Sequence, residues 1–186
     1  MKAGVLALQG DFREHCRVLA AIGAAPLEVR TPEDLASVAC LVIPGGESTT
    51  IGKLARGHGL VEPIRERAAE GMPVFGTCAG MIVMAKGLIG GEPLLSLMDV
   101  TVERNAYGRQ VDSFEADVDV RGEPEAVRGV FIRAPVVVEV GEGVEVIAEH
   151  AGRPVVVEQG SLLAAAFHPE LAGDPRLHAR FLERVG

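Results

Sequence analysis

A cysteine in a glycine-rich turn is the residue best suited to chemistry in this chain. Cys78 lies in the run Gly76-Thr77-Cys78-Ala79-Gly80, between a short apolar segment and a helical pattern. A G-x-C-x-G frame is the cysteine counterpart of the nucleophile elbow, in which a strand turns sharply into a helix and the nucleophile projects alone. The glycines are expected to leave the thiol open to a substrate, and the helix start favours the thiolate. The pattern predicts nucleophilic catalysis by Cys78.

The run His168-Pro169-Glu170 offers a base and an acid to that nucleophile. Residues i and i+2 share one face only where the backbone is extended, and Pro169 disfavours helical geometry at His168. We therefore expect His168 and Glu170 side by side on an extended segment, with the carboxylate holding the imidazole and stabilising its protonated form. Each motif alone also has an ordinary explanation, namely a small buried cysteine or the exit of a strand. Together they favour a Cys78–His168–Glu170 triad.

Composition limits the remaining possibilities. The chain has 186 residues with 48% hydrophobic content, which suffices for a single domain over 1–186 with a substantial core. The net charge is −8 and the basic residues are scattered, so no nucleic-acid partner is expected. No signal-peptide pattern and no bilayer-spanning apolar stretch are present, which predicts a cytoplasmic protein without a membrane partner. Three cysteines, with neither pairing nor metal-ligand spacing, fit a reducing compartment and predict no metal.

Alternating strand-like and helical patterns predict how these motifs are positioned. The first half is expected to form strands at 3–8, 27–29, 40–43 and 73–76, and helices at 12–22, from residue 31, from about 48 to 70, and from 79 to about 86. The second half is expected to form β-rich segments at 100–102, 114–120, 136–140, 144–149, 155–157 and 162–167, and a last helix at 175–185. The first half therefore predicts a parallel sheet covered by helices, and the second half a more antiparallel elaboration.

Four motifs fall at the carboxyl ends of predicted strands, which is where open α/β sheets bind ligands. They are Gln9-Gly10 and the segments 44–48, 76–80 and 168–170. Attack of a thiolate on a carbonyl creates an oxyanion, so a working site also needs preorganised donors. The backbone N–H groups of Gly46 and Ala79 are the candidates for this oxyanion hole. The shared location of the four motifs predicts one active site.

These residues resemble the class I, triad-type glutamine amidotransferase domains, whose elbow cysteine and His-x-Glu pair correspond to Cys78, His168 and Glu170. Within that class, essentially the whole chain is similar to the glutaminase-subunit family of pyridoxal 5'-phosphate synthase. The segments that carry this closer resemblance are 8–10, 44–49, 102–105, 108–115 and 131–135. The resemblance implies an α/β fold of three layers, α/β/α and flavodoxin-like, with a mixed, mostly parallel sheet.

The resemblance also implies an activity, which is hydrolysis of L-glutamine to L-glutamate and ammonia. The ammonia would pass to a barrel-shaped synthase subunit in a multi-subunit complex that makes the vitamin B6 cofactor, and this chain would bind no cofactor itself. The family's glutamine contacts correspond to Gly46, Glu47, Ser48, Arg104, Ile132 and Arg133. The family uses the region that starts at Gln9 against the synthase, so Gln9 is expected to couple partner docking to the oxyanion hole.

Two other functions stay open from the residues alone. A cysteine peptidase or related hydrolase on the same scaffold would use the same thiol, imidazole and carboxylate, and a non-catalytic binding subunit would retain them only for packing. The remaining histidines show no ligand spacing and are expected to be surface or helix residues, with His15 nearest the predicted site; they are His15, His58, His150 and His178.

Overall fold

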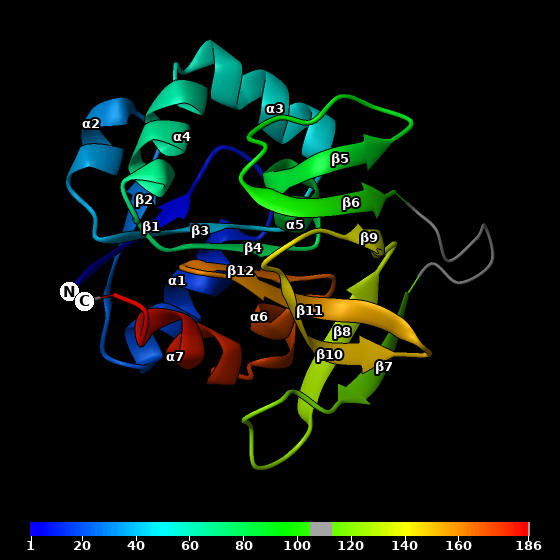
Figure 1. The fold of residues 1–186 in the computed structure, drawn as a ribbon. Coiled ribbons are helices and arrows are strands. Elements are labelled where there is room, and N and C mark those ends of the chain that lie inside the picture. Colours follow the sequence, from blue (N-terminus) through cyan, green and yellow to red (C-terminus); the bar gives the residue numbers. More distant parts are fainter. Residues whose placement is uncertain (105–112, 186) are drawn as a thin grey trace.

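The computed structural model describes residues 1–104 and 113–185. Within these residues the main sheet has seven strands in the order β10-β11-β12-β4-β3-β1-β2 (Figure 1). Its strands are β1 (Lys2–Leu6), β2 (Ala25–Val29), β3 (Cys40–Ile43), β4 (Val74–Thr77), β10 (Glu145–His150), β11 (Arg153–Gln159) and β12 (Leu162–Ala165). Neighbours from β2 through β12 pair in parallel, whereas β11 and β10 pair antiparallel at the edge. The predicted mixed, mostly parallel sheet is confirmed.

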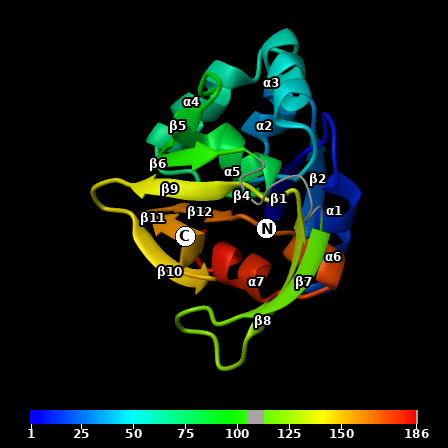
Figure 2. The same cartoon turned by 90° about the vertical axis from the view of Figure 1, so that its right-hand side faces the viewer.

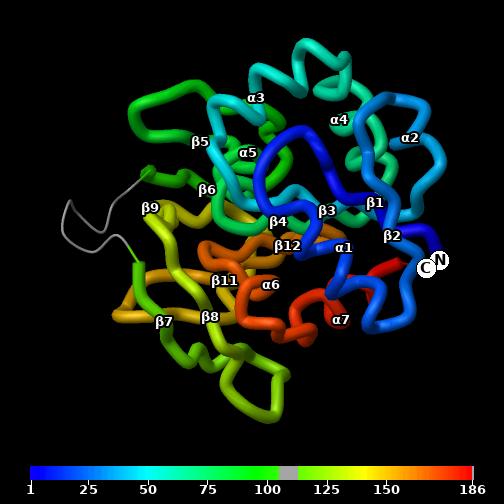
Figure 3. The backbone as a smooth tube through the Cα atoms, turned by 180° about the vertical axis from the view of Figure 1, so that it is seen from behind, coloured from blue at the N-terminus to red at the C-terminus, as the bar shows by residue number. Residues whose placement is uncertain are grey.

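Helices cover both faces of this sheet, which gives the three predicted layers. Figures 1 and 3 show α2, α3, α4 and α5 on one face, and α1, α6 and α7 on the other. The helices are α1 (Phe12–Ala21), α2 (Pro32–Ala36), α3 (Ser48–Gly57), α4 (Val61–Ala69), α5 (Ala79–Met84), α6 (Pro169–Ala172) and α7 (Arg176–Leu182). Strands β3, β4 and β12 are buried along their whole length because both of their faces are covered.

Local sequence explains where two of these helices begin. Thr31 accepts a hydrogen bond from the Asp34 N–H, while the Asp34 carboxylate accepts one from the Thr31 N–H, so a capping box starts α2 as the Thr-Pro-Glu-Asp run predicts. Helix α3 starts differently, with the Glu47 carboxylate accepting hydrogen bonds from the N–H groups of Thr49 and Thr50. Glu47 therefore has a structural task at the edge of the predicted site.

Two smaller sheets lie beside the main one (Figure 2). One has the order β5-β6-β9, and the other is the antiparallel pair β7-β8. Their strands are β5 (Ala85–Ile89), β6 (Met98–Glu103), β7 (Ser113–Val118), β8 (Val127–Ile132) and β9 (Val136–Val140). Asn105 and residues 108–112, which carry part of the family resemblance, lie outside the described residues.

The expected helix from residue 79 to 86 is wrong at its end. Helix α5 stops at Met84, and the chain continues directly as strand β5, which pairs in parallel with β6. Gly87 allows the two strands to approach, because a Cβ at this position would lie 2.4 Å from the Thr101 hydroxyl oxygen. Pairing with a distant strand, which a local pattern does not contain, thus replaces the last helical turn.

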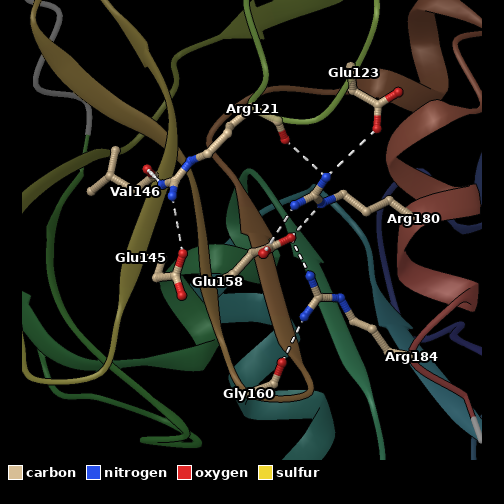
Figure 4. A network of polar contacts seen from close by, with 8 residues as sticks. All are labelled: Arg121, Glu123, Glu145, Val146, Glu158, Gly160, Arg180 and Arg184. Atoms are coloured by element: carbon tan, nitrogen blue, oxygen red, sulfur yellow. Dashed lines mark hydrogen bonds and ion pairs between the residues drawn. The ribbon is translucent and has the colours of Figure 1, made fainter.

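Helix α7 is anchored by aromatic packing on one side and by ion pairs on the other. Phe181 is fully buried, and its ring centroid lies 5.6 Å from that of Phe75 in the core. On the other side, Arg180 and Arg184 both pair with Glu158 of β11 (Figure 4). The two sets of contacts fix α7, and with it the segment after β12, against the main sheet.

Candidate active site

Cys78 lies where strand β4 turns into helix α5, as the elbow pattern predicts. Its backbone has φ 48° and ψ −105°, a conformation that a residue with a side chain rarely adopts. The Cys78 N–H donates to the Ala165 carbonyl at 2.8 Å, which ties the elbow to the end of β12. The side chain is mostly buried, at 7% exposure, and borders a cavity. The strained turn therefore presents the thiol at the carboxyl edge of the sheet.

The two glycines that flank Cys78 serve close packing of the backbone rather than access of a substrate to the thiol. A Cβ at Gly76 would lie 2.6 Å from the Gly80 carbonyl carbon, and a Cβ at Gly80 would lie 2.1 Å from the Ile43 carbonyl oxygen. Both clashes are with neighbouring backbone rather than with the space in front of the thiol. The expectation that glycine is needed to admit the substrate is therefore wrong, because these glycines permit close packing of the elbow against β3 and α5.

His168 and Glu170 follow β12 and are both buried. The His168 Nδ1 lies 2.7 Å from the Glu170 Oε1, as expected for an imidazole held by a carboxylate. The backbone differs from the prediction, since Pro169 and Glu170 already belong to the short helix α6 and His168 is its N-cap. Proline is compatible with the first turn of a helix, which the argument from an extended segment overlooked. The non-helical ψ of 88° at His168 brings the two side chains together.

Electrostatics favour a charged pair at this position. Burial alone would lower the pKa of His168, but hydrogen bonds with Cys78 and Glu170 outweigh it and raise the pKa to about 10. Burial would likewise raise the pKa of Glu170, whereas the nearby imidazoles of His15 and His168 hold it well below the usual range. The site thus holds a buried carboxylate at Glu170 and an imidazolium at His168, next to the thiol.

A cavity of about 340 Å³ opens in front of the thiol. This volume is at the small end of the range for ligand sites, which suits a ligand the size of one amino acid. The cavity is lined by most of the predicted site residues and two further ones: Gln9, Asp11, Gly46, Glu47, Ser48, Cys78, Ala79, Ile82, Arg104, Ile132, Arg133 and His168. Glu170 alone among the predicted residues is not part of the lining, because it lies behind His168.

The loop between β3 and α3 brings Gly46 to this cavity. The Gln9 Oε1 accepts a hydrogen bond of 2.8 Å from the Glu47 N–H, and a Cβ at Gly46 would lie 2.4 Å from the same oxygen. Hydrogen bonds from Thr49 and Thr50 to the Glu47 carboxylate lower its pKa to about 2. The Glu47 carboxylate therefore caps α3 at the edge of the cavity, while Gln9 directly contacts the loop that carries the candidate oxyanion donor.

Two arginines also line the cavity. The Arg104 Nη1 donates to the Thr49 hydroxyl at 3.2 Å, while its Nε is buried without a hydrogen-bond partner among the described residues. Arg133 is exposed and has the unusual φ of 43°. The Ile132 carbonyl lies 3.8 Å from the Cys78 Sγ, close enough to accept from the thiol. The Ile132–Arg133 segment thus lines the cavity next to the nucleophile.

Several residues that the sequence did not single out complete the site. Asp11 borders the cavity with its Oδ2 3.5 Å from the His168 Nδ1. Gly45 packs on the imidazole, since a Cβ there would lie 2.2 Å from the His168 Cε1. His15 and His178 lie on helices α1 and α7, as one of the expected alternatives has it, but they are fully buried behind Glu170 rather than at the surface. Only the position of His15 after a strand-end motif offered a signal.

Asp11, His168 and Glu170 also form a cluster that could in principle hold a cation, with one ligand atom of each within 4.8 Å of the others. The Nδ1 of His168 already contacts Glu170, and the ring interacts with Cys78. Both imidazole nitrogens are therefore engaged with side chains of the chain itself, which leaves neither of them free to bind a cation. No helix in the described part of the chain is long and apolar enough to cross a membrane.

The fold, with a thiol elbow and a His-x-Glu pair at one small cavity, is that of a class I glutamine amidotransferase domain. The chain belongs to the SNO glutamine amidotransferase family, whose family model matches residues 5–186. It is 60% identical over 187 residues to the pyridoxal 5'-phosphate synthase subunit PdxT of Pelotomaculum thermopropionicum, covering 99% of this chain and 95% of that protein. It is 55% identical over 188 residues to the same subunit of Frankia alni, and the match covers 99% of this chain and 94% of that protein.

A solved structure supports the same assignment. A crystal structure described as a glutamine amidotransferase superposes with a TM-score of 0.94 at 54% identity, covering 99% of this chain and 98% of the other. The agreement over nearly the full length of both chains confirms the predicted fold class and the family resemblance.

Proposed function

We propose that this chain hydrolyses L-glutamine to L-glutamate and ammonia and delivers the ammonia to a synthase subunit that makes pyridoxal 5'-phosphate. The observation that carries the proposal is the meeting of Cys78 and the His168–Glu170 pair at one small cavity. Relatives at 55–60% identity are named as subunits of pyridoxal 5'-phosphate synthase, which supports the choice of pathway. A cytoplasmic location is part of the proposal.

In the proposed mechanism the Cys78 thiolate attacks the side-chain amide carbon of glutamine. The N–H groups of Gly46 and Ala79 stabilise the resulting oxyanion, each such donor being worth about 3 kcal/mol of barrier in a comparable hydrolase. The His168 imidazolium then protonates the amide nitrogen, so the C–N bond breaks, ammonia leaves and a thioester remains. His168 next takes a proton from water, the hydroxide attacks the thioester, and glutamate departs as Cys78 is regenerated.

The cavity also suits the amino-acid end of glutamine. The substrate carries an α-carboxylate, which needs cationic or N–H partners, and an α-ammonium group, which needs acceptors. Arg104 and Arg133 supply the positive charge, and the backbone of Gly46, Glu47 and Ile132 supplies polar groups. Ser48, at the start of α3, also lines the cavity. We assign these residues to substrate binding, and the Glu47 carboxylate also caps α3.

Gln9 is proposed to couple the partner to the oxyanion hole. Its side chain holds the Glu47 N–H, so a shift of the loop that follows β1 would move the backbone at Gly46. A barrel-shaped synthase docking on this region is expected to stimulate turnover through that contact. We expect Gln9→Ala to reduce partner-stimulated glutaminase turnover, and unchanged stimulation would refute the coupling.

The decisive experiment measures glutamate and ammonia release from free glutamine, with and without the synthase subunit. The intact chain is expected to release both, whereas Cys78→Ala is expected to lose the activity almost completely. Cys78→Ser, which keeps the size of the side chain, serves as the matched control for folding. A glutamine-analogue electrophile should label Cys78. Cleavage of peptides instead of glutamine would favour the peptidase alternative, and full activity of Cys78→Ala would favour a non-catalytic subunit.

A further inference from the structure

A chain of buried polar side chains continues behind the triad, away from the cavity. The His15 Nε2 lies 3.1 Å from the Thr77 Oγ1 and 3.5 Å from the Glu170 Oε1. On its other side, the His15 Nδ1 lies 2.8 Å from the His178 Nε2. His15, Thr77 and His178 are all 0% exposed and come from α1, the end of β4 and α7. The proposed mechanism uses none of the three.

The hydrogen bonds of this chain fix which nitrogens carry protons. The Nδ1 of His178 is buried without a partner among the described residues. A buried N–H without an acceptor is rarer and costlier than a buried lone pair without a donor. His178 therefore carries its proton on Nε2 and donates to the His15 Nδ1, which leaves the proton of His15 on Nε2. The Nε2 that carries this proton is hydrogen-bonded to the Thr77 hydroxyl and lies 3.5 Å from the Glu170 Oε1.

We propose that His15 is a positioning residue for the reaction, whose Nε2–H holds the Glu170 carboxylate in the orientation that binds His168. This inference rests on the proposed function in so far as the reaction is glutamine hydrolysis. His15 does not touch the cavity and is absent from its lining. It acts through Glu170, because the Oε1 of that residue faces both His15 and His168.

The Glu170 carboxylate needs the contact with His15 because it has few other hydrogen-bond partners. Glu170 is buried, and its Oε2 has no hydrogen-bond partner in the part of the chain that the structure describes. A buried carboxylate with few partners is costly, and it rotates or takes up a proton when one is lost. Besides each other, the ionisable groups that bear on His15 and on its partner His178 are Asp11, Glu170 and Asp174. Of these, only Glu170 faces the Nε2 of His15.

A matched pair of substitutions separates positioning from packing. In His15→Gln the terminal amide N–H can occupy the place of the imidazole Nε2 and keep the contact with the Glu170 carboxylate. In His15→Asn the shorter amide reaches only the place of Nδ1, so the contact with Glu170 is lost. We expect His15→Asn to lower kcat by about tenfold or more with KM changed less than about twofold. His15→Gln should retain kcat within about threefold of the parent. Rates are normalised to protein that is folded by circular dichroism, with the synthase subunit present.

A second readout does not depend on glutamine at all. Alkylation of Cys78 by iodoacetamide requires the thiolate, which the His168 imidazolium stabilises. We expect the midpoint of its pH dependence to move upward by roughly 0.5 to 1 pH unit in His15→Asn and to stay in place in His15→Gln. The proposal is overturned if neither kcat nor the midpoint changes in His15→Asn, or if His15→Gln is impaired as much as His15→Asn.

The tautomers supply a test in the unaltered protein, which remains decisive if His15→Asn does not fold. Nitrogen-15 NMR should find His15 and His178 both protonated on Nε2, and a proton on the His178 Nδ1 would overturn the proposal. A result that refutes glutamine hydrolysis can be told apart from one that refutes the role of His15. The parent would then release no ammonia from glutamine, while the alkylation midpoints and the tautomers would still decide the role of His15.

Discussion

Helix α7 (Arg176–Leu182) takes part in two polar networks that differ in burial and in redundancy. On its inner side, His178 contacts His15, which in turn faces Glu170. On its outer side, Arg180 contacts Glu158, which Arg184 also reaches from beyond the end of the helix (Figure 4). The inner network is sealed from solvent, whereas the side chains of Arg180 and Glu158 are 22% and 13% exposed.

The two networks also differ in how many contacts each member has. Glu158 has two arginine partners, and Arg180 additionally contacts Glu123 and the Arg121 carbonyl (Figure 4). The inner network has fewer contacts, since within the described residues the Glu170 Oε2 and the His178 Nδ1 have no partner. Loss of one member of the outer network should therefore lower the stability of the protein somewhat. Loss of one member of the inner network should instead change the geometry of the proposed triad. Ion pairs stabilise this helix, and the histidines orient the proposed triad.

Glu170→Gln should show the largest effect, because it removes the charge at the end of the inner network. The amide cannot stabilise the His168 imidazolium, and its N–H would face the His168 Nδ1. The corresponding acid-to-amide change in a serine protease lowers kcat about 10⁴-fold, and a thiol needs less assistance, so we expect a loss of about 10²-fold or more. Steady-state glutamine turnover with the synthase subunit measures it. Turnover within threefold of the parent would contradict the proposed triad.

An intermediate effect is expected from two substitutions on α7, one for each network. His178→Phe keeps the ring that packs on Phe75, at a centroid distance of 5.4 Å, but removes the donor to His15. We expect turnover to fall about 3- to 10-fold, with the free energy of unfolding changed by less than about 1 kcal/mol. Arg180→Met keeps the apolar stem and removes the charge. We expect unchanged turnover and a loss of stability of about 1–2 kcal/mol.

Urea unfolding and glutamine turnover, measured on both variants, test this separation. The proposed division of roles is contradicted if Arg180→Met lowers glutamine turnover without lowering the free energy of unfolding. It is also contradicted if His178→Phe lowers the free energy of unfolding and leaves turnover unchanged. A third variant, Glu145→Ala, provides the matched control. Glu145 pairs with Arg121 at 3.3 Å on the surface, where both side chains are more than 60% exposed. Such a pair contributes little to stability, so neither measurement should change appreciably.

The predictable part of this site lies in short motifs at strand ends. Cys78 and His168 could be found from the sequence because the turn that presents each of them is encoded within a few residues, and Gly46 because it follows a buried strand. The parallel sheet then brings these turns to one edge, as the general rule for α/β sheets requires. Nearly every strand and helix of the first half has its expected place, because periodicity and flanking turns determine them locally.

The unpredicted part depends on contacts between distant segments. His15 and His178 are 163 positions apart, and only folding shows that they meet behind Glu170. Strand β5 exists because β6 pairs with it, and β8, which the sequence reading did not identify, pairs with β7. His168 is non-helical as predicted, but the expected extended segment ends there, since proline permits the first turn of a helix and α6 begins at Pro169. Local patterns thus locate the reacting groups, whereas the residues that support them become visible only in three dimensions.

Glu158→Gln should have the smallest of the effects and should depend on pH. Burial would raise the pKa of Glu158, but its hydrogen bonds with Arg180 and Arg184 lower it below the ordinary value of a glutamate. A carboxyl whose pKa is lower in the folded than in the unfolded state contributes stability above the unfolded pKa, near 4.3, and loses it as the pH falls through the folded pKa.

We therefore expect Glu158→Gln to be about 1 kcal/mol less stable than the parent at pH 7, with a smaller difference near pH 3.5. The glutamine carbonyl can still accept a hydrogen bond from one arginine, and Arg180 keeps its contacts with Glu123 and the Arg121 carbonyl. Urea unfolding at both pH values measures the difference, and glutamine turnover should stay unchanged. A difference that grows on acidification would show that the pKa of Glu158 is raised instead. Lost turnover at full stability would show that the outer network also reaches the site.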